Sequence, residues 1–268
     1  MGGVSSARNI GLKYIQDCDW IAFVDADDYL NKDYISSMLG YNADVIVSGS
    51  QWLNEKYEKI KIDIPKREKK TIEEIKQEYY ELGGFAGPCS KLYKKNAINN
   101  MKFDETLKIG EDTIFNLKVF QQIKIVQYID YCGYNICVNE SSLTHNVYGK
   151  YSALLELEYH KMWQKKIEKT LIDVGIPRNK VYIHAENNAY IIVYQMLSNL
   201  FAHECPYSKK EIKEKIRNIL NYNVDKERVF LAKKTNNKKL SKLIKVIYKI
   251  NSVDFTYFMF RIINIICK

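Results

Sequence analysis

A short apolar segment, residues 20–25, runs directly into a group of three aspartates, Asp25, Asp27 and Asp28. A run that is apolar on both faces is typical of a strand covered on both sides within an α/β sheet. Because side chains alternate along a strand, we expect Asp25 and Asp27 on one side and Asp28 on the other. The carboxyl ends of strands are also where open α/β sheets bind their ligands.

Two interpretations of this aspartate group follow from the residues alone. Asp25 and Asp27 together supply hard oxygen ligands, which suit Mg²⁺ or Mn²⁺. Alternatively, the group is only a polar strand end, with Asp28 or Asn31 capping a helix that begins near Lys32. Motifs elsewhere in the chain are needed to decide between a metal site and a cap.

The charge of the chain is concentrated at its end. Residues 226–268 contain eleven lysines and arginines against two acids, which accounts for the whole net charge of +9. We therefore expect no nucleic-acid partner, since such proteins spread basic residues over their working face. The six cysteines are scattered without a zinc or disulfide spacing, and we find neither a secretory signal nor a membrane-spanning stretch. These features predict a cytoplasmic protein with reduced thiols.

The predicted elements alternate between helix and strand up to residue 148 and are helical afterwards. Thr71 and Glu74 have the spacing of a capping box at the start of one helix. The periodicity predicts helices over 4–16, 32–40, 71–82 and 110–121, and strands over 20–25, 44–49 and 124–138. We expect an α/β domain over residues 1–148 and a helical extension over 149–268.

Four motifs follow one another in the first half of the chain. They are GVSSARNIG at residues 3–11, FVDADD at 23–28, SKLYKK at 90–95 and GEDTIFN at 110–116. In this order and at these separations they resemble the signatures of family 2 glycosyltransferases of the GT-A fold. NESSLTH at residues 139–145 also resembles the segment that closes such domains in enzymes of bacterial surface polysaccharide synthesis. The resemblance covers residues 2–148 and implies a Rossmann-like nucleotide-sugar domain.

The resemblance implies an enzymatic activity with assigned residues. A sugar would pass from a nucleotide sugar, UDP-linked in our expectation, to a hydroxyl of a glycan or lipid-linked acceptor with inversion at the anomeric carbon. Asp27 would be the principal ligand of Mg²⁺ or Mn²⁺, and Asp25 would lie near the metal and the ribose. Asp112 would be the general base, with Glu111 as the neighbouring alternative.

Each remaining candidate has a simpler explanation beside the functional one. Arg8 would bind the nucleotide, or form only a solvated salt bridge. Lys91 would reach a phosphate or the acceptor, or be an ordinary loop lysine. His145 would be a third metal ligand, or a loop histidine without a role. Glu111 and Asp112 are also favoured at a helix start simply by the helix dipole.

A glycine-rich loop precedes the SKLYKK motif. Gly83, Gly84 and Gly87 lie within five residues of one another. The loop is either a mobile lid over the acceptor or merely a turn.

The chain departs from the family pattern at its beginning. Such domains ordinarily open with a strand and an early aspartate that recognises the nucleotide base, both before the GVSSARN segment. We therefore expect a parallel GT-A domain that lacks its first strands and leaves an edge of the strand 20–25 bare. The alternative hypothesis is a catalytically inactive remnant that acts, if at all, as an interaction module. Much of a catalysed rate depends on the residues that position the catalytic carboxylates, and these would be missing.

The C-terminal tail, residues 240–266, predicts amphipathic helices. Apolar residues at 240, 243, 244, 247 and 250 share one helical face, and lysines lie largely on the other. This pattern is typical of a helix in the membrane interface, which would place the enzyme at the inner face of the membrane near a lipid-linked acceptor. The alternative is a helix that packs its apolar face on the main domain.

Overall fold

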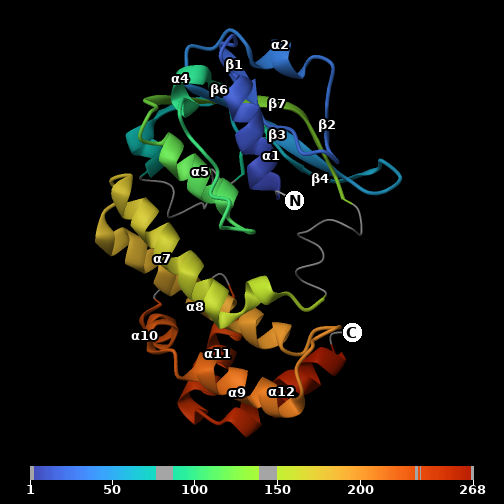
Figure 1. The fold of residues 1–268 in the computed structure, drawn as a ribbon, viewed down its shortest axis with the longest axis vertical. Coiled ribbons are helices and arrows are strands. Elements are labelled where there is room, and N and C mark those ends of the chain that lie inside the picture. Colours follow the sequence, from blue (N-terminus) through green and yellow to red (C-terminus); the bar gives the residue numbers. More distant parts are fainter. Residues whose placement is uncertain (1–2, 77–86, 139–149, 233–234, 236, 267–268) are drawn as a thin grey trace. The chain divides into compact units, whose positions relative to one another are not determined.

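The computed structural model describes residues 3–76, 87–138, 150–232, 235 and 237–266 (Figure 1). The chain divides into two compact units. The first, Met1–Glu140 with Lys169–Ile176, contains the sheet, and we call it the sheet unit. The second, Ser141–Glu168 with Pro177–Lys268, we call the helical unit.

A seven-stranded mixed sheet forms the sheet unit, in the order β1-β6-β3-β7-β2, with β4 paired to β3 and β5 paired to β7. β3 and β7 run parallel, with Val45 opposite Val126, whereas the other described pairings are antiparallel. The expected parallel sheet is therefore wrong: among the described strands, β3 and β7 form one parallel pair, and antiparallel neighbours surround it. The strands are β1 (Trp20–Ala22), β2 (Tyr29–Leu30), β3 (Val45–Leu53), β4 (Lys59–Asp63), β5 (Glu68–Thr71), β6 (Lys91–Lys94) and β7 (Ile125–Cys137).

Among the described strands, β1 has β6 as its single neighbour. This strand spans three residues rather than the six expected, and it lies at the end of the described strand order instead of in the middle. Its register places Ile21 opposite Tyr93 of β6. In the described part of the sheet, β1 therefore pairs along one edge.

The helices of the sheet unit follow the predicted segments closely. Residues 72–76 are helical, and the expected capping box is confirmed: the Thr71 amide donates to Glu74 (2.7 Å), and the Glu74 amide donates to the Thr71 hydroxyl (3.3 Å). The other helices are α1 (Val4–Gly11), which continues as a 3₁₀ turn over Leu12–Tyr14, and α2 (Tyr34–Met38), α4 (Lys95–Ile98) and α5 (Glu111–Val119).

An aromatic cluster holds the end of β1 against α5. Phe23 lies in edge-to-face contact with Tyr93, Phe103 and Phe115, at centroid distances of 5.8, 5.4 and 5.6 Å. Phe103 and Phe115 stack at 4.0 Å. Such ring pairs add about 0.5–1.5 kcal/mol each beyond the area that they bury. Because Phe23 comes two residues before Asp25, the cluster fixes the aspartates near the start of α5.

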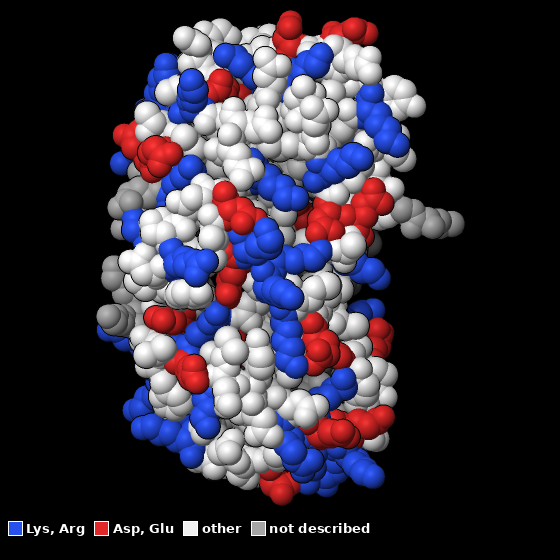
Figure 2. Space-filling view, turned by 60° about the vertical axis from the view of Figure 1, so that its left-hand side comes forward, with Lys and Arg blue, Asp and Glu red and all other residues white. Residues whose placement is uncertain are grey.

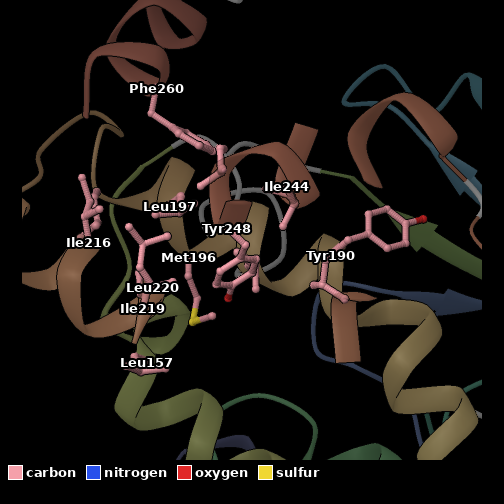
Figure 3. Packing of buried hydrophobic residues seen from close by; sticks show 14 of the residues in the cluster. Leu157, Tyr190, Met196, Leu197, Ile216, Ile219, Leu220, Ile244, Tyr248 and Phe260 are labelled. Atoms are coloured by element: carbon pink, nitrogen blue, oxygen red, sulfur yellow. The ribbon is translucent and has the colours of Figure 1, made fainter. Parts of the chain in front are cut away.

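The helical unit is built around one apolar core (Figure 3). Side chains of several helices, among them Leu197, Tyr248 and Phe260, point toward one another within it. Its elements are a 3₁₀ turn (Ala153–Leu155), α7 (Leu157–Asp173), α8 (Arg178–Asn199), α9 (Lys209–Leu220), α10 (Asn223–Leu231), α11 (Lys238–Ile250) and α12 (Val253–Ile266). The end of α7, from Lys169, belongs to the sheet unit.

The apolar face of the tail is largely used in this core. Ile244 and Ile247 of α11 are fully buried, Leu240 and Leu243 pack against the same cluster, and Ile250 is exposed. The packing alternative therefore accounts for most of this face, although the partner is the helical unit's own core rather than the main domain as expected. No helix of the described residues is long and apolar enough to span a bilayer.

The expected α/β fold class, followed by a helical extension, is confirmed. The described cysteines are free. On the face shown in Figure 2, basic and acidic side chains are interspersed.

Candidate functional site

The aspartates after β1 lie in a turn rather than on a strand. β1 ends at Ala22, and the Asp28 amide donates to the Asp25 carbonyl at 3.0 Å. Strand alternation therefore does not set the directions of Asp25 and Asp27, and that expectation was wrong. Aspartate tolerates tight turns because its side chain bonds to nearby backbone groups, which fits this local geometry.

Asp28 anchors the turn to β7. Its carboxylate accepts hydrogen bonds from the Tyr134 hydroxyl (2.8 Å) and the Cys137 amide (3.0 Å). The Asp25 amide in turn donates to the Tyr134 oxygen at 3.1 Å. Burial raises the pKa of the Asp28 carboxyl, against the effect of these two hydrogen bonds. The expected cap is wrong, since the N-cap of α2 is Asp33.

Asn31, the other expected cap, also has a different role. Its side-chain oxygen accepts a hydrogen bond from Asn135 of β7 at 3.0 Å. Asp28 and Asn31 thus both tie the segment after β1 to β7.

Arg8 of α1 joins this turn to the start of α5. Its Nη2 lies 2.6 Å from Asp25 Oδ1, and its Nη1 lies 3.5 Å from Glu111 Oε1. The guanidinium carbon is 5.2 Å from the centre of the Phe103 ring. The side chain is only 12 % exposed, so the pair with Glu111 (9 % exposed) is buried rather than solvated. Three segments that are far apart in the sequence converge at this arginine.

Glu111 and Asp112 open α5 in different environments. Gly110, at a φ of 83°, precedes them as the N-cap. Glu111 is buried, and burial raises the pKa of its carboxyl, with a further contribution from the Asp112 charge. Asp112 is half-buried, and its Oδ1 accepts a hydrogen bond from the Thr113 amide at 2.6 Å. Both acids lie in the first turn, where the helix dipole favours negative charge.

Lys91 is buried and turns toward the backbone of the preceding loop. Its Nζ donates to the Gly87 carbonyl at 2.7 Å and lies 3.4 Å from the Cys89 carbonyl. Burial lowers its pKa to about 8, although the nearby Asp112 charge acts in the opposite direction. The expected alternative, that Lys91 is an ordinary solvated loop lysine, is therefore wrong.

Lys91 makes folding stability depend on pH at alkaline values. Its pKa is about 8 in the folded chain against an ordinary 10.5, so between these values the unfolded state holds more protons and stability rises with pH. Relative to Lys91→Met, we expect a rise of about 3 kcal/mol across this window, because a tenfold difference in proton affinity corresponds to about 1.4 kcal/mol. Urea unfolding at a series of pH values measures the slope.

The matched control for this measurement is Lys118→Met, which removes an exposed lysine of α5. The alkaline rise should persist in that variant. Equal slopes for wild type and Lys91→Met would show that Lys91 is not desolvated.

Asp27 is exposed and, within the described residues, makes no hydrogen bond or ion pair. Asp25 is 39 % exposed and already faces Arg8. In the described part of the chain, no group of three or more His, Cys, Asp or Glu residues could hold a metal ion. His145 lies outside the described residues. Two neighbouring carboxylates nevertheless fit Mg²⁺ or Mn²⁺ in a substrate complex, since such ions take one or two carboxylates together with phosphate oxygens and water.

Sequence reasoning did not single out Tyr134 or Asn116. Tyr134 supports both Asp25 and Asp28 from β7, and nothing in its local sequence marks it. Asn116 is 1 % exposed and belongs to the GEDTIFN motif, so its place one turn after Asp112 was a usable signal.

Comparison with known proteins identifies the first part of the chain. Residues 2–101 match the family model described as Glycosyl transferase family 2. The chain contains a family 2 glycosyltransferase domain. The recognition made from the motifs is confirmed. Arg8, Asp25, Asp27 and Lys91 lie inside the matched region, whereas the acidic pair at the start of α5 follows it and reaches the site through folding.

Individual relatives include two Bacillus subtilis (strain 168) proteins. "Uncharacterized glycosyltransferase EpsJ" is 27 % identical over 248 residues, which are 85 % of this chain and 67 % of EpsJ. "Minor teichoic acid biosynthesis protein GgaB" is 25 % identical over 282 residues, which cover 96 % of this chain and 29 % of GgaB. The chain thus spans about two thirds of EpsJ and less than a third of GgaB.

One solved structure that resembles this chain is the S. aureus TarS fragment 1–349. It aligns with 97 % of this chain and 70 % of its own length, at 16 % identity and a TM-score of 0.49.

Proposed function

We propose that this glycosyltransferase transfers a sugar from a UDP-linked donor to a hydroxyl of a glycan or lipid-linked acceptor, with inversion at the anomeric carbon. The observation that carries the proposal is the convergence of Arg8, Asp25 and Glu111 from three separate segments beside the exposed Asp27. In such a site the cation and the metal-binding carboxylates suit a charged leaving group, and a further carboxylate suits the role of proton acceptor. The name of GgaB supports an acceptor among cell-surface polymers.

In this proposal Asp27 and Asp25 hold Mg²⁺ or Mn²⁺. When bound, the ion would neutralise the charge that develops on the departing diphosphate. Arg8 keeps Asp25 oriented through its 2.6 Å ion pair and adds positive charge to the same side of the site. His145 stays a proposed third ligand.

Asp112 is the proposed general base, with Glu111 as the alternative. One oxygen of Asp112 is held by the Thr113 amide, and Oδ2 lies on the side of Gly87, where a Cβ would be 3.9 Å away. Oδ2 would take the proton of the acceptor hydroxyl while that oxygen bonds to the anomeric carbon and the bond to the nucleoside diphosphate breaks. Glu111 is buried at 3.5 Å from Arg8, which suits an orienting role better.

The alternative of an inactive remnant is not favoured by the family match and the retained carboxylates. We further propose that the transferase domain covers residues 1–148, and that the enzyme is cytoplasmic. A peripheral contact with the inner face of the membrane through 240–266 would use exposed residues such as Ile250 and Phe258, at 47 % and 61 % exposure, because most of the apolar face of α11 is buried.

The test is a calorimetric titration of the chain with UDP, with and without Mn²⁺, beside Asp27→Ala. We expect Mn²⁺-dependent binding that Asp27→Ala loses, because the variant removes the principal metal ligand. Asp17→Ala, which removes an exposed aspartate of the same unit, is the control and should bind like wild type.

Failure of folded wild-type protein to bind UDP would eliminate UDP as the donor nucleotide. GDP, CDP and dTDP would then be titrated in the same way. If none of them binds, the proposed transferase activity is contradicted.

A further inference from the structure

The carbonyl oxygen of Gly87 accepts hydrogen bonds from two buried side chains. Lys91 Nζ donates from the start of β6 at 2.7 Å, and Asn116 Nδ2 donates from α5 at 2.6 Å. Lys91 is 5 % exposed and Asn116 is 1 % exposed. A carbonyl oxygen has two lone pairs, so this arrangement uses its full accepting capacity.

The orientation of Asn116 is determined by a third group. The Tyr93 hydroxyl donates to Asn116 Oδ1 at 2.6 Å, which turns the amide nitrogen toward Gly87. Tyr93 is itself fully buried in the aromatic cluster that includes Phe23. The bond between Tyr93 and Asn116 is buried, and the two bonds to Gly87 are partly buried. Loss of the Asn116 amide would therefore take this acceptor from the buried Tyr93 hydroxyl and one of two donors from the Gly87 carbonyl.

The turn held in this way borders the proposed base. Gly87 has a φ of +69°, and a Cβ placed on it would lie 3.9 Å from Asp112 Oδ2. Asn116 follows Asp112 by four residues on α5, so both project from one face of the helix. Within the described residues, the absence of a side chain at Gly87 therefore leaves room beside the Asp112 carboxylate.

We propose that Asn116 and Lys91 are positioning residues that hold the Gly87 carbonyl, and that the turn they fix shapes the space through which an acceptor hydroxyl reaches Asp112. We call this pair the Gly87 clamp. The inference rests on the proposed function for its catalytic consequence, but the grip on the carbonyl is a structural feature that can be measured separately.

Replacement of Asn116 by Ala tests the clamp. A displacement of about 1 Å at a reacting group costs up to about 10²-fold in rate. We therefore expect kcat to fall by about 10- to 100-fold, with the KM for the donor and the affinity for UDP unchanged, because the turn borders the base rather than the aspartates that would hold the metal. Hydrogen exchange at the Cys89 and Ser90 amides should become faster in the same variant.

Asn199→Ala is the matched control. Asn199 is also a buried asparagine with two hydrogen bonds, to the Ser152 amide (2.8 Å) and carbonyl (2.9 Å), but it belongs to the helical unit. Its loss should leave kcat and the exchange of the turn unchanged. A second variant, Lys91→Met, should reproduce the effect of Asn116→Ala, and the double variant should lose less than the product of the two, because both act through one carbonyl.

The outcomes separate the clamp from the proposed function. A folded Asn116→Ala protein with kcat within about twofold of wild type and unchanged exchange at Cys89 and Ser90 would overturn the clamp. Strictly multiplicative losses in the double variant would overturn the shared route through Gly87. A wild-type chain that binds no nucleotide overturns the proposed function, while the exchange measurement still decides whether Asn116 holds the turn.

Discussion

Replacing Asp112 by asparagine lowers kcat for sugar transfer by about 10²- to 10⁴-fold, the range that a general base contributes. Asparagine has the same shape and still accepts the 2.6 Å hydrogen bond of the Thr113 amide, but it cannot take the acceptor proton. UDP binding should stay unchanged, because the base acts on the acceptor. Steady-state kinetics with saturating donor measure the loss.

Glu111→Gln is the companion variant that decides between the two acids. We expect a smaller loss of kcat than in Asp112→Asn, since Glu111 is buried beside Arg8 and acts by orienting it. A larger loss in Glu111→Gln than in Asp112→Asn would exchange the two roles and make Glu111 the base.

Replacing Arg8 by methionine has the largest expected effect on stability in the sheet unit. The change leaves the Glu111 carboxylate buried without its cation, and breaking one side of a buried pair costs about 3–5 kcal/mol. We expect about 3 kcal/mol, at the lower end, because Asp25, the other partner, is 39 % exposed and water screens it. Urea unfolding at neutral pH gives the value.

The loss in Arg8→Met should also depend on pH in a defined direction. Burial already raises the pKa of Glu111, and removal of Arg8 raises it further. The folded state then holds more protons than the unfolded state just above the ordinary carboxyl pKa of 4.5, so stability falls as pH rises through that window. In the double variant Arg8→Met/Glu111→Gln the Glu111 carboxylate is also removed, so no unpaired charge is left buried. This variant should recover much of the lost stability at neutral pH.

Arg67→Met serves as the control for this prediction. Arg67 pairs with Asp130, but the two side chains are 60 % and 53 % exposed, so the variant should unfold like wild type. If Arg8→Met is equally harmless, the bridge between α1, the aspartate turn and α5 contributes nothing to stability.

Local patterns in the sequence predicted most elements of the sheet unit. The Thr71–Glu74 capping box forms as expected, and α5 begins at Glu111 directly after Gly110. β7 covers Ile125–Cys137, close to the expected strand over 124–138. These features depend on periodicity and on capping chemistry within a few residues, which a single sequence displays directly.

Strand neighbours and side-chain directions were harder to predict from the sequence. β3 pairs in parallel with β7 but antiparallel with β6, and no local pattern distinguishes these partners. The turn at Asp25 ended the strand early and redirected the aspartates, because Tyr134 on a distant strand holds Asp28 there. Amphipathicity in the tail did not distinguish between membrane and protein as the partner of the apolar face; the core of the helical unit takes most of it.

The sequence by itself indicated the family, the candidate carboxylates and the longer elements, because these are carried by short motifs and local periodicity. The short strands β2, β4, β5 and β6 were not expected. Only the tertiary structure decided that Arg8 joins Asp25 to Glu111, across separations of 17 and 103 residues. It alone decided that Lys91 and Asn116 meet at one carbonyl. Contacts of this kind depend on how distant segments pack, and packing is a property of the whole fold rather than of any one segment.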